Sequence, residues 1–463
     1  MTPRHSSSAA FSAPPPNSDA QTLFKHARQV FDECDSLRES YWELQRRGEK
    51  KQAQAAKQEA KELLATLGLA GAGIGQERMQ GEVDREWSYQ KGDAGGEHNR
   101  WANVRPWDHA MLPEPYLNAS TIPPLAWAPQ KDIKTLQPFV ASQAPLPNTF
   151  STFWHHFLSS GARLVVNLTP VYDAYGMTKV RKSHQYWPDH RKQPFDAGDG
   201  WEVELVRQTK HTTRTKPDSD TQSEVEARTT APPAARLMDR AIGASGSGSG
   251  SGSTTKNSGH ATGSSSSSGS GSDSRRSSHQ SSHQPDKDWT IVRRDLLIRP
   301  PQKWEPAPLA SYVDALYDCT GTGPHHSPTA VNRANPDGSG WPVTLLHVDA
   351  WADGGADSSL NFCRLVDLVQ DTQRRLCPAS SSPVPPIWVH CSAGIGRTGT
   401  LVAGMMARAL ASSHEPTLRA YPAEKIVLIL WRYLRERRYG MITTPQQAMM
   451  VADEIERVRR GLT

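Results

Sequence analysis

Residues 388–400 read Trp-Val-His-Cys-Ser-Ala-Gly-Ile-Gly-Arg-Thr-Gly-Thr, and in this stretch Cys391 and Arg397 bracket five uncharged, mostly small residues. The apolar run at 386–390 predicts a buried strand, and the run at 398–410 predicts a helix. The loop between them therefore joins a strand to a helix N-terminus. Its glycines and small side chains let successive backbone N–H groups turn inward, which favours the binding of a tetrahedral oxyanion.

Cys391 lies at the centre of this loop, where the N–H groups, the helix dipole and Arg397 all act to lower the pKa of a thiol. The pattern therefore predicts a nucleophilic thiolate. Arg397 adds a planar guanidinium that can bind two phosphate oxygens at once, and Thr398 can donate a hydrogen bond to the sulfur. The alternative is an inert, buried cysteine, but the two glycines and the threonine favour the nucleophile.

This segment resembles the phosphate-binding signature of the protein tyrosine phosphatases, His-Cys-x5-Arg-Ser/Thr. Other segments resemble further motifs of the tyrosine-specific, cysteine-dependent members. They are the recognition loop (98–108), a Tyr-x-Asn-Ala strand (116–120), a Gln-x-Pro segment (139–149), a Lys-x-x-x-Tyr-Trp-Pro segment (182–188), the acid loop (345–355) and the glutamine loop (441–447). The resemblance implies an α/β fold, in which one catalytic domain of the non-receptor type holds a highly twisted mixed β-sheet flanked by helices, with long insertions.

The resemblance also implies hydrolysis of phosphotyrosine in proteins through a cysteinyl-phosphate intermediate. Cys391 is the expected nucleophile, Arg397 binds the phosphate, and Asp353 protonates the departing phenolate oxygen. Asp189 follows a Trp-Pro pair of the kind usual in the family's acid loop, but only Asp353 preserves the order strand, acid loop, helix, signature strand. His390 is expected to orient the loop and tune the thiol.

Further site residues follow from the same resemblance. The expected phosphate-binding residues are Ser392, Ala393, Gly394, Ile395, Gly396 and Arg397. The expected substrate-binding residues are Trp101, Asn103, Lys182 and Gln447. Trp101 stands where the family has an aromatic wall around phosphotyrosine, and an ordinary core tryptophan is its alternative. The resemblance implies that no cofactor and no metal are needed, and the sequence agrees in holding no His/Cys/Asp cluster at ligand spacing.

Departures from the family pattern keep other functions open. Asn103 replaces the aspartate that holds the peptide backbone, Ala352 replaces the acid-loop proline, and Thr443 replaces the glutamine that positions the hydrolytic water. A weakly active or inactive phosphotyrosine-binding module is one alternative, and a dual-specificity protein phosphatase is another. Uncharged residues inside the signature loop argue against a phosphoinositide phosphatase. The groups that break bonds all remain, so an enzyme is the favoured interpretation.

Composition sets expectations for class, partners and location. The chain has 463 residues, 36% of them hydrophobic, with 34 glycines, 35 prolines and a net charge of +5, which fits one packed domain with unpacked segments. Phosphotyrosyl proteins are the expected partners, and scattered basic residues make nucleic acid a poor candidate. Five irregularly spaced cysteines fit a reducing compartment. No membrane span or signal peptide is expected, so the cytoplasm is the expected location, with the nucleus as a second option.

Several segments differ from the rest in composition. Residues 1–20 are expected to be disordered, and 21–67 to be helical, because apolar residues recur at three-to-four spacing from Phe24 to Leu44. The charged second half, from Arg46 to Glu62, shows no such apolar stripe. That helical segment is expected to cover the catalytic domain, with the docking of a protein partner as the alternative. The catalytic domain is expected over 85–460, with a disordered Ser/Gly insertion at about 210–286 in a β-hairpin tip and a second insertion at about 302–341.

Overall fold

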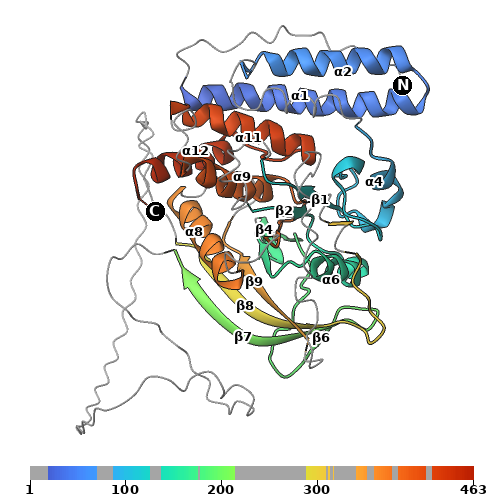
Figure 1. Ribbon diagram of the computed structural model, residues 1–463, viewed down its shortest axis with the longest axis vertical. Coiled ribbons are helices and arrows are strands. Elements are labelled where there is room, and N and C mark those ends of the chain that lie inside the picture. The colour runs from blue at the N-terminus through green and yellow to red at the C-terminus, as the bar shows by residue number, and fades with distance from the viewer. Residues whose placement is uncertain are drawn as a thin grey trace, which may run out of the picture. The chain divides into compact units, whose positions relative to one another are not determined.

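The computed structural model has an α/β fold with a mixed eight-stranded sheet and flanking helices, which confirms the predicted fold class (Figure 1). Several predictions lie outside the described residues, namely those on residues 1–18, on most of both insertions and on Asp353. The structure describes residues 19–69, 87–125, 137–175, 178–213, 288–308, 311–312, 316, 340–351, 359–377, 384–412 and 420–462.

The sheet places the carboxyl ends of four parallel strands at one edge. In spatial order its strands are β1 (Ala119–Ile122), β2 (Phe139–Ser142), β10 (Ile387–His390), β3 (Leu164–Asn167), β9 (Trp341–Val348), β8 (Thr290–Arg299), β7 (Glu202–Thr212) and β6 (Phe195–Asp196). The pairs β2–β10, β10–β3 and β3–β9 are parallel, and the other pairs are antiparallel. The loops that follow β2, β10, β3 and β9 therefore converge, as they do where α/β sheets bind ligands. A separate two-stranded sheet pairs β4 (Tyr172–Tyr175) with β5 (Thr178–Arg181).

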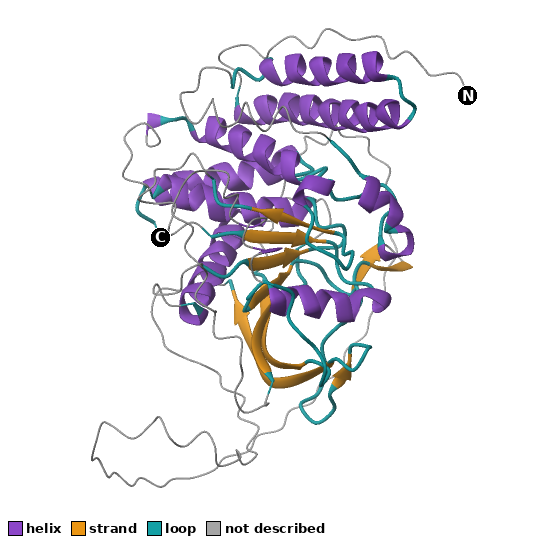
Figure 2. Ribbon diagram, turned by 45° about the vertical axis from the view of Figure 1, so that its right-hand side comes forward, coloured by secondary structure: helices purple, strands orange, loops and turns teal. Residues whose placement is uncertain are grey.

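The two faces of the sheet are covered by different helices (Figure 2). Ile387 and Val389 of β10 belong to the cluster of α8 (Ser359–Leu376), α9 (Gly396–Ala411), α11 (Ala423–Arg437) and α12 (Pro445–Arg459). Trp388, which points to the other face, belongs to the cluster of α6 (Phe150–Ser159). Because both faces are buried, the central strands are continuous apolar runs rather than alternating ones. Shorter helical turns are α4 (Gln90–Ala94), Gly96–His98, Asp108–Ala110 and Pro147–Thr149.

The N-terminal segment forms two helices, α1 (Ala20–Arg46) and α2 (Lys50–Ala65), that pack as a hairpin. The turn between them contains Gly48 at a φ of +77°, a conformation that favours glycine. No apolar stripe was predicted for the second half of the segment. The structure shows one made mainly of alanines, which are too small to stand out in a hydrophobic pattern. The buried residues of this stripe are Ala53, Ala56, Ala60 and Leu64.

The first helix of this hairpin packs on two of the helices that cover the sheet. Phe24, Val30 and Phe31 are buried in the same cluster as the residues of α11 and α12, and α1 contacts both of those helices (Figure 1). Its start is fixed by Asp19, whose carboxylate accepts a hydrogen bond of 2.7 Å from the Thr22 backbone N–H. Within the described residues, the hairpin thus shares one hydrophobic core with α11 and α12.

The predicted insertions are bounded by regular structure. Strands β7 and β8 pair antiparallel from Glu202↔Arg299 to Thr212↔Thr290, so the segment between them closes one long hairpin. Part of the second predicted insertion is packed: Tyr312 is fully buried and its hydroxyl lies 2.6 Å from His156 Nδ1.

Candidate active site

The phosphate loop joins β10 to α9 at the carboxyl edge of the sheet. Its shape depends on Gly394, which has a φ of +74°. A Cβ atom there would lie 2.1 Å from the Ser142 backbone oxygen, so only glycine fits between the loop and β2. The first turn of α9 follows at Gly396, which leaves the N–H groups of the loop and of the helix N-terminus free to surround Cys391.

Cys391 is a buried thiol with a lowered pKa. Burial by itself raises the pKa, but the Arg397 charge, the Thr398 hydroxyl and the N–H groups of Thr398 and Ile395 outweigh that effect. All of these groups hydrogen-bond or attract the sulfur in its charged form. The loop is therefore arranged to hold a thiolate.

Arg397 connects the phosphate loop to the segment in which the acid was predicted. Its Nη1 donates a hydrogen bond of 2.7 Å to the Trp351 backbone oxygen, and its side chain is buried. Trp351 stacks on Trp289 with ring centroids 5.0 Å apart. Asp353 follows two positions later and lies outside the described residues. The alternative acid, Asp189, is exposed and accepts a hydrogen bond of 2.7 Å from Gln185 Nε2.

His390 is held in one neutral form by two hydrogen bonds. Its Nδ1 lies 3.3 Å from the Cys391 backbone oxygen, which can only accept, so Nδ1 carries the proton. Its Nε2 then accepts from the Tyr186 hydroxyl at 2.6 Å. Burial lowers the pKa of His390 to about 3, so the ring is uncharged at neutral pH. His390 thus orients the start of the loop without adding positive charge to it.

The glutamine loop lies against the phosphate loop. A Cβ atom on Gly396 would lie 3.2 Å from Gln447 Nε2 and 2.6 Å from Thr443 Oγ1. Thr443 donates two hydrogen bonds to Gln447 Oε1, from its N–H at 2.8 Å and from its hydroxyl at 3.1 Å. Because both donors occupy the amide oxygen, the amide nitrogen of Gln447 is the group left to face water or substrate. Thr443, expected only as the loss of a glutamine, therefore orients the remaining one.

The recognition loop is fixed to the segment that follows β2. Arg100 donates from its backbone N–H to Gln143 Oε1 at 2.8 Å and from its Nε to the Ala144 oxygen at 3.2 Å. Trp101 is 40% exposed, so it is not an ordinary core tryptophan. Asn103 is exposed near it, whereas Lys182 is buried.

Two residues that support the site were missed at the sequence level. Arg438 is fully buried and clamps the phosphate loop, because its Nε donates to the Gly394 oxygen at 2.8 Å and its Nη2 to the Ala393 oxygen at 3.0 Å. It follows two other arginines at the end of α11, where basic residues usually serve only the helix dipole. Tyr186 was placed in a family segment but given no role. Its hydroxyl fixes His390.

The described residues show neither a metal site nor a membrane-spanning helix. Nowhere among them do three or more His, Cys, Asp or Glu side chains gather in a way that could hold a metal ion. Of the helices in the described segments, none is both long enough and apolar enough to cross a membrane.

Comparisons with known proteins agree with this geometry. The family model for protein-tyrosine phosphatase matches residues 96–232 and 328–456, more than half of the chain. Tyrosine-protein phosphatase 1 of Caenorhabditis elegans is 38% identical over 116 residues, which is 25% of this chain and 10% of that protein. Tyrosine-protein phosphatase non-receptor type 4 of Homo sapiens is 34% identical over 118 residues, 25% of this chain and 11% of that protein. The match thus spans about a tenth of these relatives. The chain belongs to the protein-tyrosine phosphatase family.

Proposed function

We propose that this chain hydrolyses phosphotyrosine in proteins. The observation that carries the proposal is Cys391, a buried thiol whose pKa is lowered by Arg397, Thr398 and two backbone N–H groups. A thiolate inside an oxyanion-binding loop at a helix N-terminus is suited to attack phosphorus and to bind the phosphate oxygens in the same place.

In the first step the Cys391 thiolate attacks phosphorus, and the bond from phosphorus to the tyrosine oxygen breaks. The loop N–H groups and Arg397 stabilise the equatorial oxygens as charge develops on them. Asp353 gives its proton to the departing phenolate oxygen. Because Arg397 is bonded to the backbone at Trp351, phosphate binding and the position of the acid loop are coupled through one side chain.

In the second step a water molecule attacks phosphorus, the phosphorus–sulfur bond breaks and the thiolate returns. Asp353 takes the proton from the water. The Thr398 hydroxyl stabilises the thiolate as it leaves. The Gln447 amide nitrogen lies beside Gly396 and is oriented by Thr443, so it can hold the water.

Selectivity for tyrosine follows from the depth of the loop. A phosphotyrosine side chain reaches further than phosphoserine, and an exposed aromatic at the rim can stack on its ring. Trp101 is exposed on the recognition loop, which is anchored through Arg100 next to the phosphate loop. We propose that Lys182 contacts the acid loop and that Asn103 contacts the substrate backbone.

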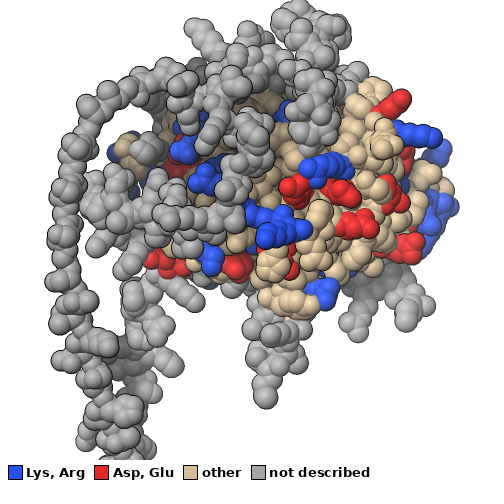
Figure 3. Space-filling view, turned by 90° about the horizontal axis from the view of Figure 1, so that it is seen from below, with Lys and Arg blue, Asp and Glu red and all other residues tan. Residues whose placement is uncertain are grey.

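We propose phosphotyrosyl proteins as partners and the cytoplasm as the location. A catalytic thiol needs a reducing compartment, and the cysteines in the described part of the chain, Cys34, Cys363, Cys377 and Cys391, are free. Figure 3 shows acidic and basic side chains interspersed on one face, without the single-sign field that nucleic acid favours. The proposed catalytic domain covers 85–460, with the low-complexity insertion between β7 and β8.

The test is phosphate release from three matched peptides that carry phosphotyrosine, phosphoserine or phosphothreonine, without added metal. Release from the phosphotyrosyl peptide alone is the expected result. Release from all three would make the chain a dual-specificity phosphatase. Binding of the phosphotyrosyl peptide without release would make it a binding module.

A further inference from the structure

Helix α1 carries a carboxylate that is buried where the N-terminal hairpin meets the catalytic domain. Asp35 is 1% exposed. Its Oδ1 accepts a hydrogen bond of 2.9 Å from Arg38, and its Oδ2 accepts from Arg435 Nη1 at 2.8 Å and from the Gly440 N–H at 3.2 Å. A buried charge needs such partners, because losing one leaves the other uncompensated. Asp35 therefore depends on, and constrains, the segment at 435–440.

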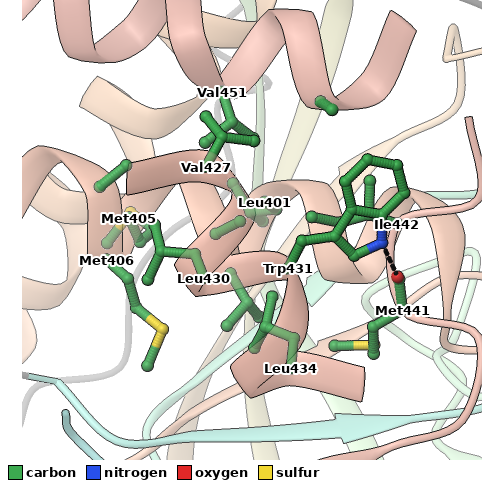
Figure 4. Packing of buried hydrophobic residues seen from close by; sticks show 14 of the residues in the cluster. Leu401, Met405, Met406, Val427, Leu430, Trp431, Leu434, Met441, Ile442 and Val451 are labelled. Atoms are coloured by element: carbon green, nitrogen blue, oxygen red, sulfur yellow. Dashed lines mark hydrogen bonds between the residues drawn. The ribbon is translucent and has the colours of Figure 1, made fainter. Parts of the chain in front are cut away.

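Arg435 extends this connection into the glutamine loop. The side chain is 2% exposed. Its Nε donates to the Met441 oxygen at 2.9 Å, and its Nη2 donates to the Ile442 oxygen at 3.1 Å. The Met441 oxygen also accepts from Trp431 Nε1 at 2.9 Å (Figure 4). One guanidinium thus joins a carboxylate of α1 to two consecutive carbonyls at the start of the glutamine loop.

The residue held in this way has an unusual backbone. Ile442 has a φ of +58°, a left-handed conformation that β-branched residues rarely adopt unless the surroundings impose it. Its N–H donates to the Ile395 oxygen in the phosphate loop at 3.3 Å. A Cβ atom on Gly399 would lie 2.7 Å from the same nitrogen. The strained residue therefore touches the phosphate loop directly, and Thr443, which orients Gln447, follows it.

We propose that Asp35 is a positioning residue through which the docking of α1 holds the glutamine loop in its working conformation. It acts through Arg435 and Gly440, which keep Ile442 left-handed and so place Thr443 and Gln447 against Gly396. This inference rests on the proposed function in one respect: it assigns Gln447 to the water-attack step. The second step should therefore depend on Asp35 more than the first.

The test compares Asp35→Asn with Val30→Ala in the full chain. Val30 is a fully buried apolar residue of the same helix, so its truncation loosens the same interface without removing a charge. With an aryl phosphate, Asp35→Asn should lower kcat about tenfold, the scale of a small misplacement near the reacting groups. It should leave kcat/KM nearly unchanged, since that ratio reports the first step. Rapid mixing should then show a burst of phenol that the parent and Val30→Ala lack.

A second readout does not need turnover. Hydrogen exchange in a peptide covering 439–447 should speed up in Asp35→Asn and stay at the parent's rate in Val30→Ala. Asp32→Asn serves if Asp35→Asn does not fold, because Asp32 is 50% exposed and accepts from the same Arg435 Nη1 at 2.8 Å. It should show the same changes at smaller size.

The inference is wrong if exchange at 439–447 responds equally to Asp35→Asn and Val30→Ala, or to neither. It is also wrong if kcat and kcat/KM fall together, since Asp35 would then serve only the stability of the site. A parent chain that releases no phosphate would overturn the proposed function instead, and the exchange experiment would still decide the role of Asp35.

Discussion

Cys391 in the phosphate loop and Cys34 in α1 are both buried, yet their acidities move in opposite directions. Burial raises the pKa of Cys34 to about 12, although Arg38 and Arg435 lie near enough to lower it. The Cys34 thiol donates to the Ala60 backbone oxygen at 3.6 Å, and that oxygen can only accept. In the phosphate loop the pKa of the thiol moves the other way, because the Arg397 charge, the Thr398 hydroxyl and the N–H groups of Thr398 and Ile395 all lower it. A nearby arginine is thus insufficient to lower the pKa of a buried thiol. Hydrogen-bond donors around the sulfur account for the lower pKa of Cys391.

The largest expected effect is that of removing the thiol that the donors surround. Cys391→Ser should lower turnover of an aryl phosphate by about 10⁴-fold or more, as loss of a nucleophile does in other enzymes. The N–H groups and Arg397 remain, so inorganic phosphate should still bind with an affinity close to the parent's.

Cys34→Ser is the matched control, since it makes the same atomic change at a buried thiol without donors. Its turnover should stay close to that of the parent. If the two substitutions cost the same, the phosphate loop has no special role, and the change from sulfur to oxygen acts only through stability.

The second largest effect is expected from removing the acid that protonates the leaving group. Asp353→Ala should slow phosphotyrosine turnover by about 10² to 10⁴, the usual contribution of general acid catalysis. Asp189→Ala should have little effect, because Asp189 is exposed and bonded to Gln185. Steady-state rates across pH would check both variants, and a costlier loss at Asp189 would assign the acid to the Trp-Pro-Asp segment at 187–189.

A smaller effect should follow from removing one donor to the sulfur. Thr398→Val keeps the shape of the side chain but loses the hydroxyl that helps to lower the pKa of Cys391. The pKa of Cys391 should rise, so a smaller fraction of the thiol is ionised at low pH. At about pH 6, kcat/KM should therefore fall about tenfold, the value of one hydrogen bond to a charged group. The loss should shrink as the pH rises.

Thr400→Val is the control for this change. Its hydroxyl is buried in the same helix but donates to the Gly396 backbone oxygen at 2.9 Å. Its pH profile should match the parent's. A shift of equal size in both variants would mean that helix packing, and not the bond to sulfur, sets the acidity.

The smallest effect is expected from the low-complexity tract. Deletion of residues 243–284 should leave turnover of a small aryl phosphate within about threefold, because exposed polar segments at loop tips tolerate change. The pairing of β7 with β8 reaches Thr212↔Thr290 and does not depend on the deleted residues. Aggregation or unfolding of the deleted chain would show that the tract contributes to the core.

The strand, the loop and the helix around Cys391 could be predicted from local sequence, because glycine spacing and apolar runs report local geometry. The residues that support the phosphate loop from other parts of the chain could not be predicted in this way. Arg438 is 47 positions after Cys391 and looks like a helix-end arginine, and only the fold brings it to Gly394 and Ala393.

The N-terminal helices show the same limit. The stripe of α1 was visible in the pattern, whereas the alanine stripe of α2 carries almost no hydrophobic signal. Nothing in the local sequence distinguishes Asp35 from the exposed carboxylates of the same helix. Its burial depends on pairing with Arg435, 400 positions away, and long-range pairing of this kind is set by tertiary packing.

The acidity difference between the two buried cysteines can be measured directly by alkylation with iodoacetamide across pH, read out by peptide mass spectrometry. Cys391 should be modified at about pH 6, where an ordinary thiol is protonated, and orthovanadate should protect it. Cys34 should stay unmodified to about pH 9 in the folded chain, and the two should react alike in guanidinium chloride. Modification of Cys34 before Cys391, or a Cys391 that reacts only at the pH of a free thiol, would contradict the assignment of Cys391 as a stabilised thiolate.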